Sequence, residues 1–256
     1  MAGVEGIEPS SGVLETLILP MNYTPMNVYY FIKTIKLSQV FWFFILILYN
    51  IFMQTKRIVS NHLESNTYVI GIADECVIVD AGAEIGDVIK AVEGKRVVGI
   101  LLTHGHFDHA FNILEYAAYF SCKIYASKKA EINLRDPNKN YGKNFAISDF
   151  KDFVWVDDGS VLSLGKYFNI SCYAMPGHSA CSMGYLIETT LFAGDFLFKQ
   201  GVGRMDLYDS SKQSMFSSLQ KVKTIPFEIV ASGHGEISTA AEQKRNIEIF
   251  IKFLSR

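Results

Sequence analysis

One heptapeptide limits the folds open to this chain more than any other feature of its sequence. The run THGHFDH, residues 103–109, holds four candidate metal ligands in six positions: His104, His106, Asp108 and His109. Residues 97–102 (VVGILL) come directly before it and form an apolar run of strand length. The pattern predicts a loop at the carboxyl end of a buried strand, from which all four side chains can turn toward one point.

Three later segments repeat this context, in which a strand is followed by a turn that contains glycine. They contribute His178 after Gly177, Asp195 after Gly194, and His234 after Gly233. Glycine allows the backbone to bend so that the next side chain points back over the edge of a sheet. Of the six histidines in the chain, only His62 lies outside these clusters. We therefore expect all four segments to contribute to one site.

The rest of the pattern predicts short strands and helices in both halves of the chain. The first strands, a predicted antiparallel meander, fall at 55–60, 67–72 and 76–79, followed by a helix at 84–92 and the strand at 97–102. After the heptapeptide we expect a helix at 110–120, a strand at 123–126 and a helical segment from about 127. Later strands are predicted at 170–174, 184–188, 190–193 and 228–231, and later helices at 211–222 and 239–253. Strands in each half followed by helices favour two sheets packed face to face with helices outside.

The candidate ligands indicate which metals the site binds. Imidazoles with a few carboxylates suit zinc, iron or manganese, whereas magnesium and calcium favour mostly oxygen ligands. The cysteines are spread singly, without the CxxC spacing of a structural zinc site, so we expect buried, reduced thiols. They are Cys76, Cys122, Cys172 and Cys181.

In this order, the HxHxDH run, His178, Asp195 and His234 resemble the ligand set of the metallo-β-lactamase superfamily. The motif order covers residues 53–256. The resemblance implies an α/β (α+β) fold, an αββα sandwich of two facing mixed β-sheets flanked by helices, with the site at one edge. It also implies a division of ligands: His104, His106 and His178 for one metal, Asp108, His109 and His234 for the second, and Asp195 bridging both.

Two divalent transition metals, with zinc as the first expectation, would lower the pKa of a shared water and polarise the carbonyl that hydroxide attacks. Asp108 has a second candidate role, which is to orient the water or transfer a proton. Asp80, within VDAG at 79–82, resembles the family's first acidic motif, which supports the loops from behind the ligands. An ordinary turn residue is the alternative reading of Asp80.

Two short motifs favour one branch of the family. Class B lactamases usually have cysteine where Asp195 stands. GDFLF at 194–198 and GRMDL at 203–207 resemble glyoxalase II-like hydrolases, which implies a small-molecule thioester substrate such as an S-2-hydroxyacylglutathione. Full-length members continue into a helical domain, whereas 21 residues follow Gly235 here. The chain therefore resembles the short, single-domain branch.

Two alternatives remain open. A persulfide dioxygenase on the same fold uses one iron and carries a similar GR-x-D signature, so metal content would separate it from a hydrolase. A non-catalytic binding protein is the other, and the intact ligand set argues against it because clustered polar groups without a metal carry a desolvation cost. Near the site, Arg204 and Asp206 are predicted to form an ion pair that orders the loop beneath Asp195, so that loss of Arg204 lowers stability more than metal content; direct substrate contact is the alternative. Tyr141 lies in a polar loop where a substrate could bind, and a solvated loop is the favoured explanation.

Residues 1–52 form a predicted N-terminal extension. Residues 37–53 contain no charged residue, but the fully apolar run is slightly shorter than the about 20 residues that a spanning helix needs. Residues 37–53 are therefore a candidate membrane-anchoring segment, and we expect a cytoplasmic catalytic domain at 53–256 after it. The alternatives are an extension outside the functional unit, or a helix packed on the domain.

With 24 basic and 26 acidic residues, no nucleic-acid partner is expected. The oligomeric state is left open.

Overall fold

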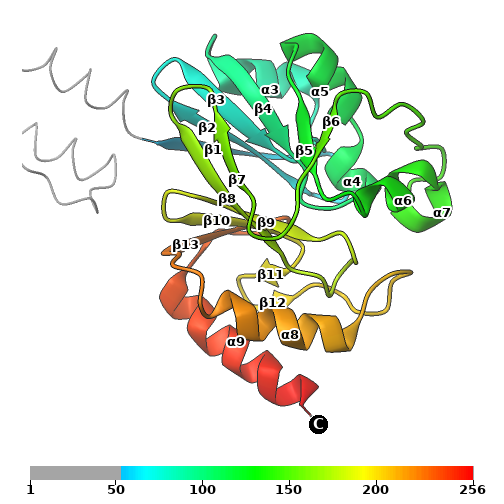
Figure 1. Cartoon of the computed structure of the whole chain (residues 1–256), viewed down its shortest axis with the longest axis vertical. Coiled ribbons are helices and arrows are strands. Elements are labelled where there is room, and N and C mark those ends of the chain that lie inside the picture. Colours follow the sequence, from blue (N-terminus) through cyan, green and yellow to red (C-terminus); the bar gives the residue numbers. More distant parts are fainter. Residues whose placement is uncertain (1–52, 256) are drawn as a thin grey trace, which may run out of the picture. The chain divides into compact units, whose positions relative to one another are not determined.

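The computed structural model describes residues 53–255, which form two six-stranded sheets and a small two-stranded one (Figure 1). The first sheet begins with the antiparallel meander β1 (Gln54–Val59), β2 (Asn66–Ile72) and β3 (Glu75–Val79). It continues in parallel with β4 (Arg96–Leu101), β5 (Ile124–Ala126) and β6 (Phe153–Trp155). The predicted meander is confirmed.

The second sheet has the order β14-β13-β10-β9-β8-β7. Its strands, in chain order, are β7 (Val161–Leu164), β8 (Phe168–Ala174), β9 (Met183–Ile187), β10 (Thr190–Gly194), β13 (Ile229–Ser232) and β14 (Ser238–Thr239). β10 and β13 are parallel, and the other neighbours are antiparallel. The hairpin β11 (Leu197–Phe198) and β12 (Gly201–Val202) follows β10. Both large sheets are therefore mixed, as expected.

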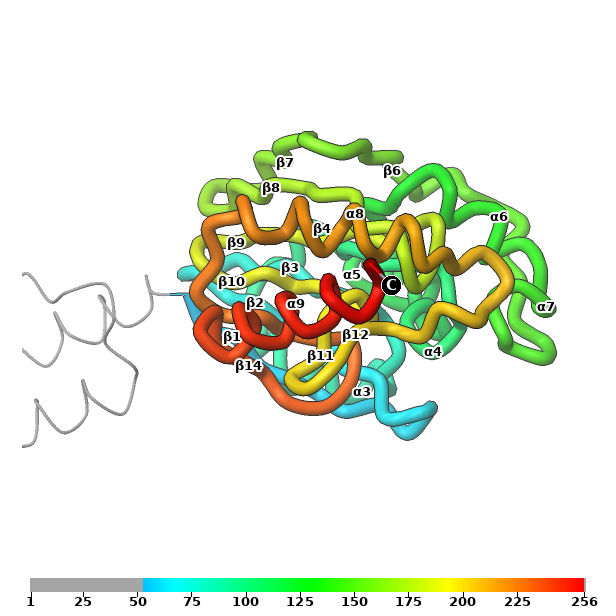
Figure 2. Tube along the Cα trace, turned by 90° about the horizontal axis from the view of Figure 1, so that it is seen from below, coloured from blue at the N-terminus to red at the C-terminus, as the bar shows by residue number. Residues whose placement is uncertain are grey.

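Helices cover the outer face of each sheet. On the first sheet lie α3 (Ile85–Val92), α4 (Phe107–Ala110) and α5 (Ile113–Phe120), with α6 (Ala130–Arg135) and α7 (Pro137–Asn140) beyond β5. α8 (Lys212–Val222) and α9 (Ala240–Leu254) lie side by side on the second sheet (Figures 1 and 2). Three buried clusters separate the four layers, one under each set of helices and one between the sheets. The predicted αββα sandwich is confirmed.

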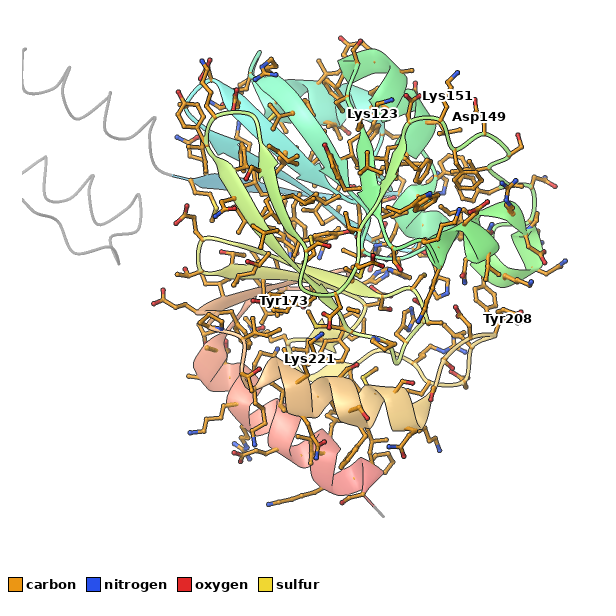
Figure 3. All side chains as sticks on the ribbon, viewed as in Figure 1. Lys123, Asp149, Lys151, Tyr173, Tyr208 and Lys221 are labelled. Atoms are coloured by element: carbon orange, nitrogen blue, oxygen red, sulfur yellow. The ribbon has the colours of Figure 1, made fainter. Side chains whose placement is uncertain are left out.

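The helix ends follow ordinary capping chemistry. Thr239 and Glu242 form a capping box at the start of α9, and Ser211 caps α8 by accepting a hydrogen bond from the Ser214 N–H. Lys221, near the end of α8, donates to the Ala174 carbonyl and lies 5.8 Å from the ring centre of Tyr173 (Figure 3). This contact joins α8 to the end of β8, close to the turn that carries His178.

Several predicted elements need correction. The helix expected at 110–120 begins at Ile113, as α5, because the chain turns at Phe111 and Asn112, and the separate short helix α4 precedes that turn. Strands β6 and β7 were not predicted, since each is short and lacks a clear alternation of apolar and polar residues. The expected buried thiols are buried at three of four positions, and Cys122 is partly exposed.

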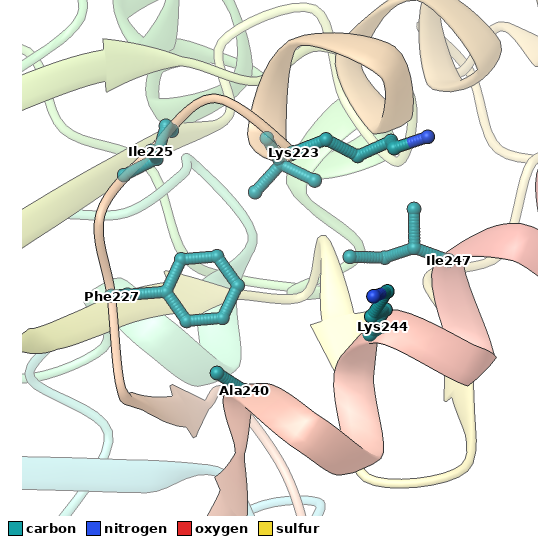
Figure 4. A pocket seen from close by; sticks show the side chains of 7 residues that line it. Lys223, Ile225, Phe227, Ala240, Lys244 and Ile247 are labelled. Atoms are coloured by element: carbon teal, nitrogen blue, oxygen red, sulfur yellow. The ribbon is translucent and has the colours of Figure 1, made fainter.

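One pocket lies away from the strand ends that carry the candidate ligands. This pocket of about 240 Å³ opens between the end of α8 and the start of α9, lined by Phe227, Ile247, Lys223, Lys244 and their neighbours (Figure 4). None of the candidate metal ligands lines it.

The candidate membrane segment at 37–53 lies outside the described residues, apart from Met53. Within 53–255, no helix combines the length and apolar character needed to span a bilayer.

Candidate metal centre

The two sheets bring the predicted ligands to one edge of the sandwich. His104 and His106 follow β4, and Asp108 and His109 lie on α4 directly after them. The remaining three follow strands of the second sheet: His178 after β8, Asp195 after β10 and His234 after β13. The site is thus built from loops of both sheets, and all seven predicted ligands meet there.

Three histidines form the first cluster. The Nδ1 atom of His106 lies 3.0 Å from Nε2 of His104 and 3.0 Å from Nε2 of His178. All three side chains are buried. Burial, together with the neighbouring histidines, lowers the pKa of each, and that of His106 falls to about 3. The cluster therefore offers three neutral imidazoles, which is the form that binds a metal.

Asp108, His109 and His234 form the second cluster. Nε2 of His234 lies 3.3 Å from Nε2 of His109 and 3.2 Å from Oδ2 of Asp108. Nε2 of His109 lies 3.4 Å from the same Asp108 oxygen. His234 is the most open of the three, with 27% of its side chain exposed. Solvent therefore reaches the site over this cluster.

Asp195 lies between the two clusters. Its Oδ2 atom is 3.5 Å from Nε2 of both His178 and His234, and its Oδ1 atom is 3.3 Å from Nε2 of His109. Oδ1 is buried and has no hydrogen-bond partner among the described residues. Ligand atoms about 2.0–2.2 Å from a tetrahedral zinc ion lie roughly 3.3 Å apart. The spacings in both clusters are close to this value, and Oδ2 of Asp195 lies equally near a histidine of each cluster.

Charge differs between the clusters. Burial lowers the pKa of His109, but the carboxylates of Asp108, Asp195 and Asp80 outweigh burial and raise it well above the ordinary value. Burial likewise lowers the pKa of His234, while hydrogen bonds to Asp108 and Asp195 raise it to about 9. Ligand histidines must be neutral to bind a metal, so metal binding at the second cluster displaces protons.

Asp80 lies behind the ligands, at the end of β3. Its Oδ1 accepts a hydrogen bond from the Thr103 N–H at 2.8 Å, and its Oδ2 accepts one from the Thr103 hydroxyl, also at 2.8 Å. The same Oδ2 lies 2.8 Å from Nδ1 of His109. Asp80 has a φ of +60°, which is unusual for a residue other than glycine. The carboxylate thus aims the His109 ring and fixes the loop that starts at Thr103.

The loop after β12 supports the first cluster through its backbone. The Arg204 carbonyl lies 3.2 Å from Nδ1 of His178, which sets the direction of that ring. The predicted Arg204–Asp206 ion pair is present, with the guanidinium donating to both carboxylate oxygens at 3.0 and 2.9 Å. Both side chains are about two-thirds exposed. The pair is therefore a surface feature, and the Arg204 backbone is what touches the site.

Tyr141 is closer to the site than the sequence indicated. Its ring centre lies 5.3 Å from that of His106, and its hydroxyl accepts a hydrogen bond from the Tyr208 N–H at 2.7 Å (Figure 3). The loop is exposed, as predicted, but Tyr141 lines the rim of the first cluster. The sequence allowed two readings of this loop, a substrate-binding loop and a solvated one, and nothing periodic around Tyr141 distinguishes them. On the other side, Phe198 lies 6.2 Å from the His234 ring.

Cys181 is the thiol that lies against the ligand loop. Its sulfur accepts a hydrogen bond from the Gly105 N–H, between His104 and His106. Burial raises the pKa of this thiol to about 11. Cysteine binds metals and acts as a nucleophile in its thiolate form. Cys181 is a buried, protonated thiol at neutral pH, so it supports the loop instead.

Comparison with known proteins places the same segment in one group. The family model described as "Metallo-beta-lactamase superfamily" matches residues 61–234. Probable metallo-hydrolase YqgX of Bacillus subtilis is 29% identical, over 76% of this chain and 96% of the relative. Hydroxyacylglutathione hydrolase GloC of Haemophilus influenzae is 28% identical, over 66% and 84%. The crystal structure of BLEG-1 B3 metallo-beta-lactamase superposes with a TM-score of 0.71 at 30% identity, over 77% of this chain and 99% of that one. The matched segment contains all seven ligands.

Proposed function

Because the chain belongs to the metallo-beta-lactamase superfamily, we propose that it is a metal-dependent hydrolase that cleaves a thioester such as an S-2-hydroxyacylglutathione. The observation that carries the proposal is the pair of ligand clusters joined by Asp195. The likeness to a hydroxyacylglutathione hydrolase, together with the GDFLF and GRMDL motifs, supports the thioester.

The residues present fit two divalent transition metals, which would lower the pKa of a water and polarise the substrate carbonyl. His104, His106 and His178 would hold one ion, and Asp108, His109 and His234 the other. Asp195, which lies against histidines of both clusters, would be shared between the two ions. Zinc is our first choice for this donor set, and iron or manganese also suits it.

The protein's own groups then have separate tasks. Burial raises the pKa of Asp108, but the charge on His109 and the hydrogen bond to His234 outweigh it, so the carboxyl stays ionised. Its Oδ2, beside the open side of the site, can hold a proton of the attacking water or accept it. Asp80 keeps the His109 ring in place from behind. Tyr141 lies beside the His106 ring and Phe198 beside the His234 ring, so each is placed to contact a substrate bound at the clusters.

The proposal is tested on the purified full chain by metal analysis combined with three assays. Release of free thiol from S-lactoylglutathione by a protein that carries about two ions per chain is the expected result. The other two assays follow hydrolysis of nitrocefin, because of the likeness to a B3 lactamase, and oxygen uptake with glutathione persulfide.

Each other outcome points to a different function. A protein with two ions that leaves thioesters intact and cleaves nitrocefin would make the substrate a β-lactam. One iron per chain with oxygen uptake would instead indicate a persulfide dioxygenase. Both results would keep the fold and the first cluster and would reject the thioesterase assignment.

A further inference from the structure

The start of β2 touches the second cluster from two sides. Ser65 precedes the strand, and its hydroxyl donates to the Asp108 carbonyl at 2.7 Å. Its backbone also forms an antiparallel bridge with His234. Gly82 lies against both residues, and a Cβ at position 82 would collide with the Ser65 hydroxyl and the Asp108 carbonyl. Asp108 and His234, two candidate ligands of the second cluster, are thus both held by the segment at the start of β2.

Asn66 and Tyr68 hold the turn that carries His234 by its carbonyls. The Asn66 N–H donates to the Gly233 carbonyl at 2.7 Å, and the Asn66 side-chain amide donates to the carbonyls of Ser232 and Gly235, both at 2.9 Å. The Tyr68 hydroxyl donates to the Ser232 carbonyl at 2.8 Å. The backbone on both sides of His234 is therefore fixed from β2.

The orientation of the Asn66 side chain leaves one of its polar atoms buried without a partner among the described residues. The two carbonyl acceptors require the NH₂ group of Asn66 to face the turn, so its Oδ1 points the other way. Oδ1 is buried and has no hydrogen-bond partner among the described residues. A buried unpartnered oxygen is costly, and an apolar side chain of similar volume would avoid the cost. The presence of asparagine at position 66 is therefore best explained by its hydrogen bonds to the carbonyls of Ser232 and Gly235.

The first cluster has different supports. His104 is approached by the Thr103 hydroxyl at 3.1 Å, and His178 by the Arg204 carbonyl. In the described part of the chain, no hydrogen bond joins residues 65–68 to residues 103–106 or 176–179. Asp80 supports both clusters through Thr103 and His109, whereas the hydrogen bonds from residues 65–68 reach only the second cluster.

We propose that Ser65, Asn66 and Tyr68 are positioning residues that set the occupancy of the second metal position through Asp108 and His234. They leave the first position unaffected. The inference rests on the two-metal site of the proposed function but not on its substrate. It makes the start of β2 the part of the fold that decides whether one ion or two are held.

The test compares variants that each remove one hydroxyl. Ser65→Ala breaks the contact to Asp108, and Tyr68→Phe breaks the contact to Ser232 while keeping the ring, which packs 5.3 Å from that of Phe192. Tyr116→Phe is the matched control, because it also removes a buried hydroxyl that donates to a backbone carbonyl, but one at Ala83. His234→Ala marks what loss of the second position looks like.

Zinc is titrated into each metal-free full-length protein by calorimetry, with chelator competition and a melting curve for each variant. We expect the weaker zinc affinity to fall about 10- to 100-fold in Ser65→Ala and Tyr68→Phe, the range found for outer-shell partners of metal ligands. The tighter affinity stays within experimental error, and Tyr116→Phe keeps both.

Three results would overturn the inference: unchanged affinities in both variants, equal loss at both positions, or a wild-type chain that binds a single ion. Failure of the proposed function is distinguishable, because a chain that binds two ions with the expected variant pattern and cleaves no thioester would reject only the substrate.

Discussion

Among the ligands, Asp195 has a position that no other residue can replace. Its Oδ2 lies 3.5 Å from a histidine of each cluster, and a Cβ on the neighbouring Gly233 would collide with its Oδ1. We expect Asp195→Ala to hold less than one ion per chain and to lose more than about 100-fold in thioester turnover, since even removal of an outer partner costs 10- to 100-fold. Metal analysis and steady-state kinetics measure both. Asp206→Asn, an exposed carboxylate on the loop after β12, is the control and should keep both properties.

Arg204 combines an exposed side chain with a functional backbone. Among residues 53–255 the guanidinium pairs only with Asp206, at the surface, where ion pairs contribute little, while the carbonyl faces His178. Arg204→Ala retains the carbonyl, so metal content and unfolding free energy should both match wild type. This differs from the sequence-based expectation that the pair orders the loop and that its loss lowers stability. A clear drop in the urea midpoint would show that the pair does stabilise the loop.

At the level of the elements, a buried carboxylate joins the sheets at the end opposite the metal site. Glu75 starts β3, is fully buried, pairs with Arg96 and accepts a hydrogen bond from the Lys166 N–H in the turn between β7 and β8. Glu75→Ala leaves that N–H without its partner and opens space between the sheets. We expect a loss of about 2 kcal/mol in the free energy of unfolding.

Urea unfolding of Glu75→Ala measures this loss, and Glu248→Ala on the exposed face of α9 controls for the removal of a carboxylate. Metal content should stay at the wild-type value in both variants, because Glu75 lies at the far end of the strand from Asp80. An unchanged unfolding midpoint would mean that the sheets are held together by their apolar contacts alone.

The elements also show what the sequence could and could not reveal. The heptapeptide predicted the turn after β4 because four potential metal ligands are crowded into six positions directly after an apolar run of strand length. The contacts from Asn66 and Tyr68 to the His234 turn join residues more than 160 positions apart, and nothing in the local pattern of β2 indicates them. β6 and β7 escaped prediction because neither shows a clear alternation of apolar and polar residues.

On the scale of the whole molecule, the ligands connect the two sheets. His104, His106, Asp108 and His109 follow a strand of the first sheet, and the other three follow strands of the second. Bound metal therefore cross-links the sandwich at one edge. Removal of the metal should lower the melting temperature, since a ligand at 100 times its dissociation constant stabilises by about 2.7 kcal/mol. Calorimetry before and after dialysis against a chelator measures the change, and re-addition of zinc should restore it. Equal melting temperatures would show that the apolar layers fix the site without metal.

The domain boundary predicted near residue 53 can be tested by the same properties. Residues 50–256 form one compact unit, and the buried clusters of 53–255 account for both faces of both sheets. A chain that starts at Met53 retains β1 in full, so its core and all seven ligands remain. We expect this fragment to bind as many ions as the full chain and to unfold in a single cooperative transition at the same urea midpoint. Reduced metal content, or a broad transition at lower urea, would mean that residues 1–52 complete the folded unit, and the catalytic domain would then have to be redefined to include them.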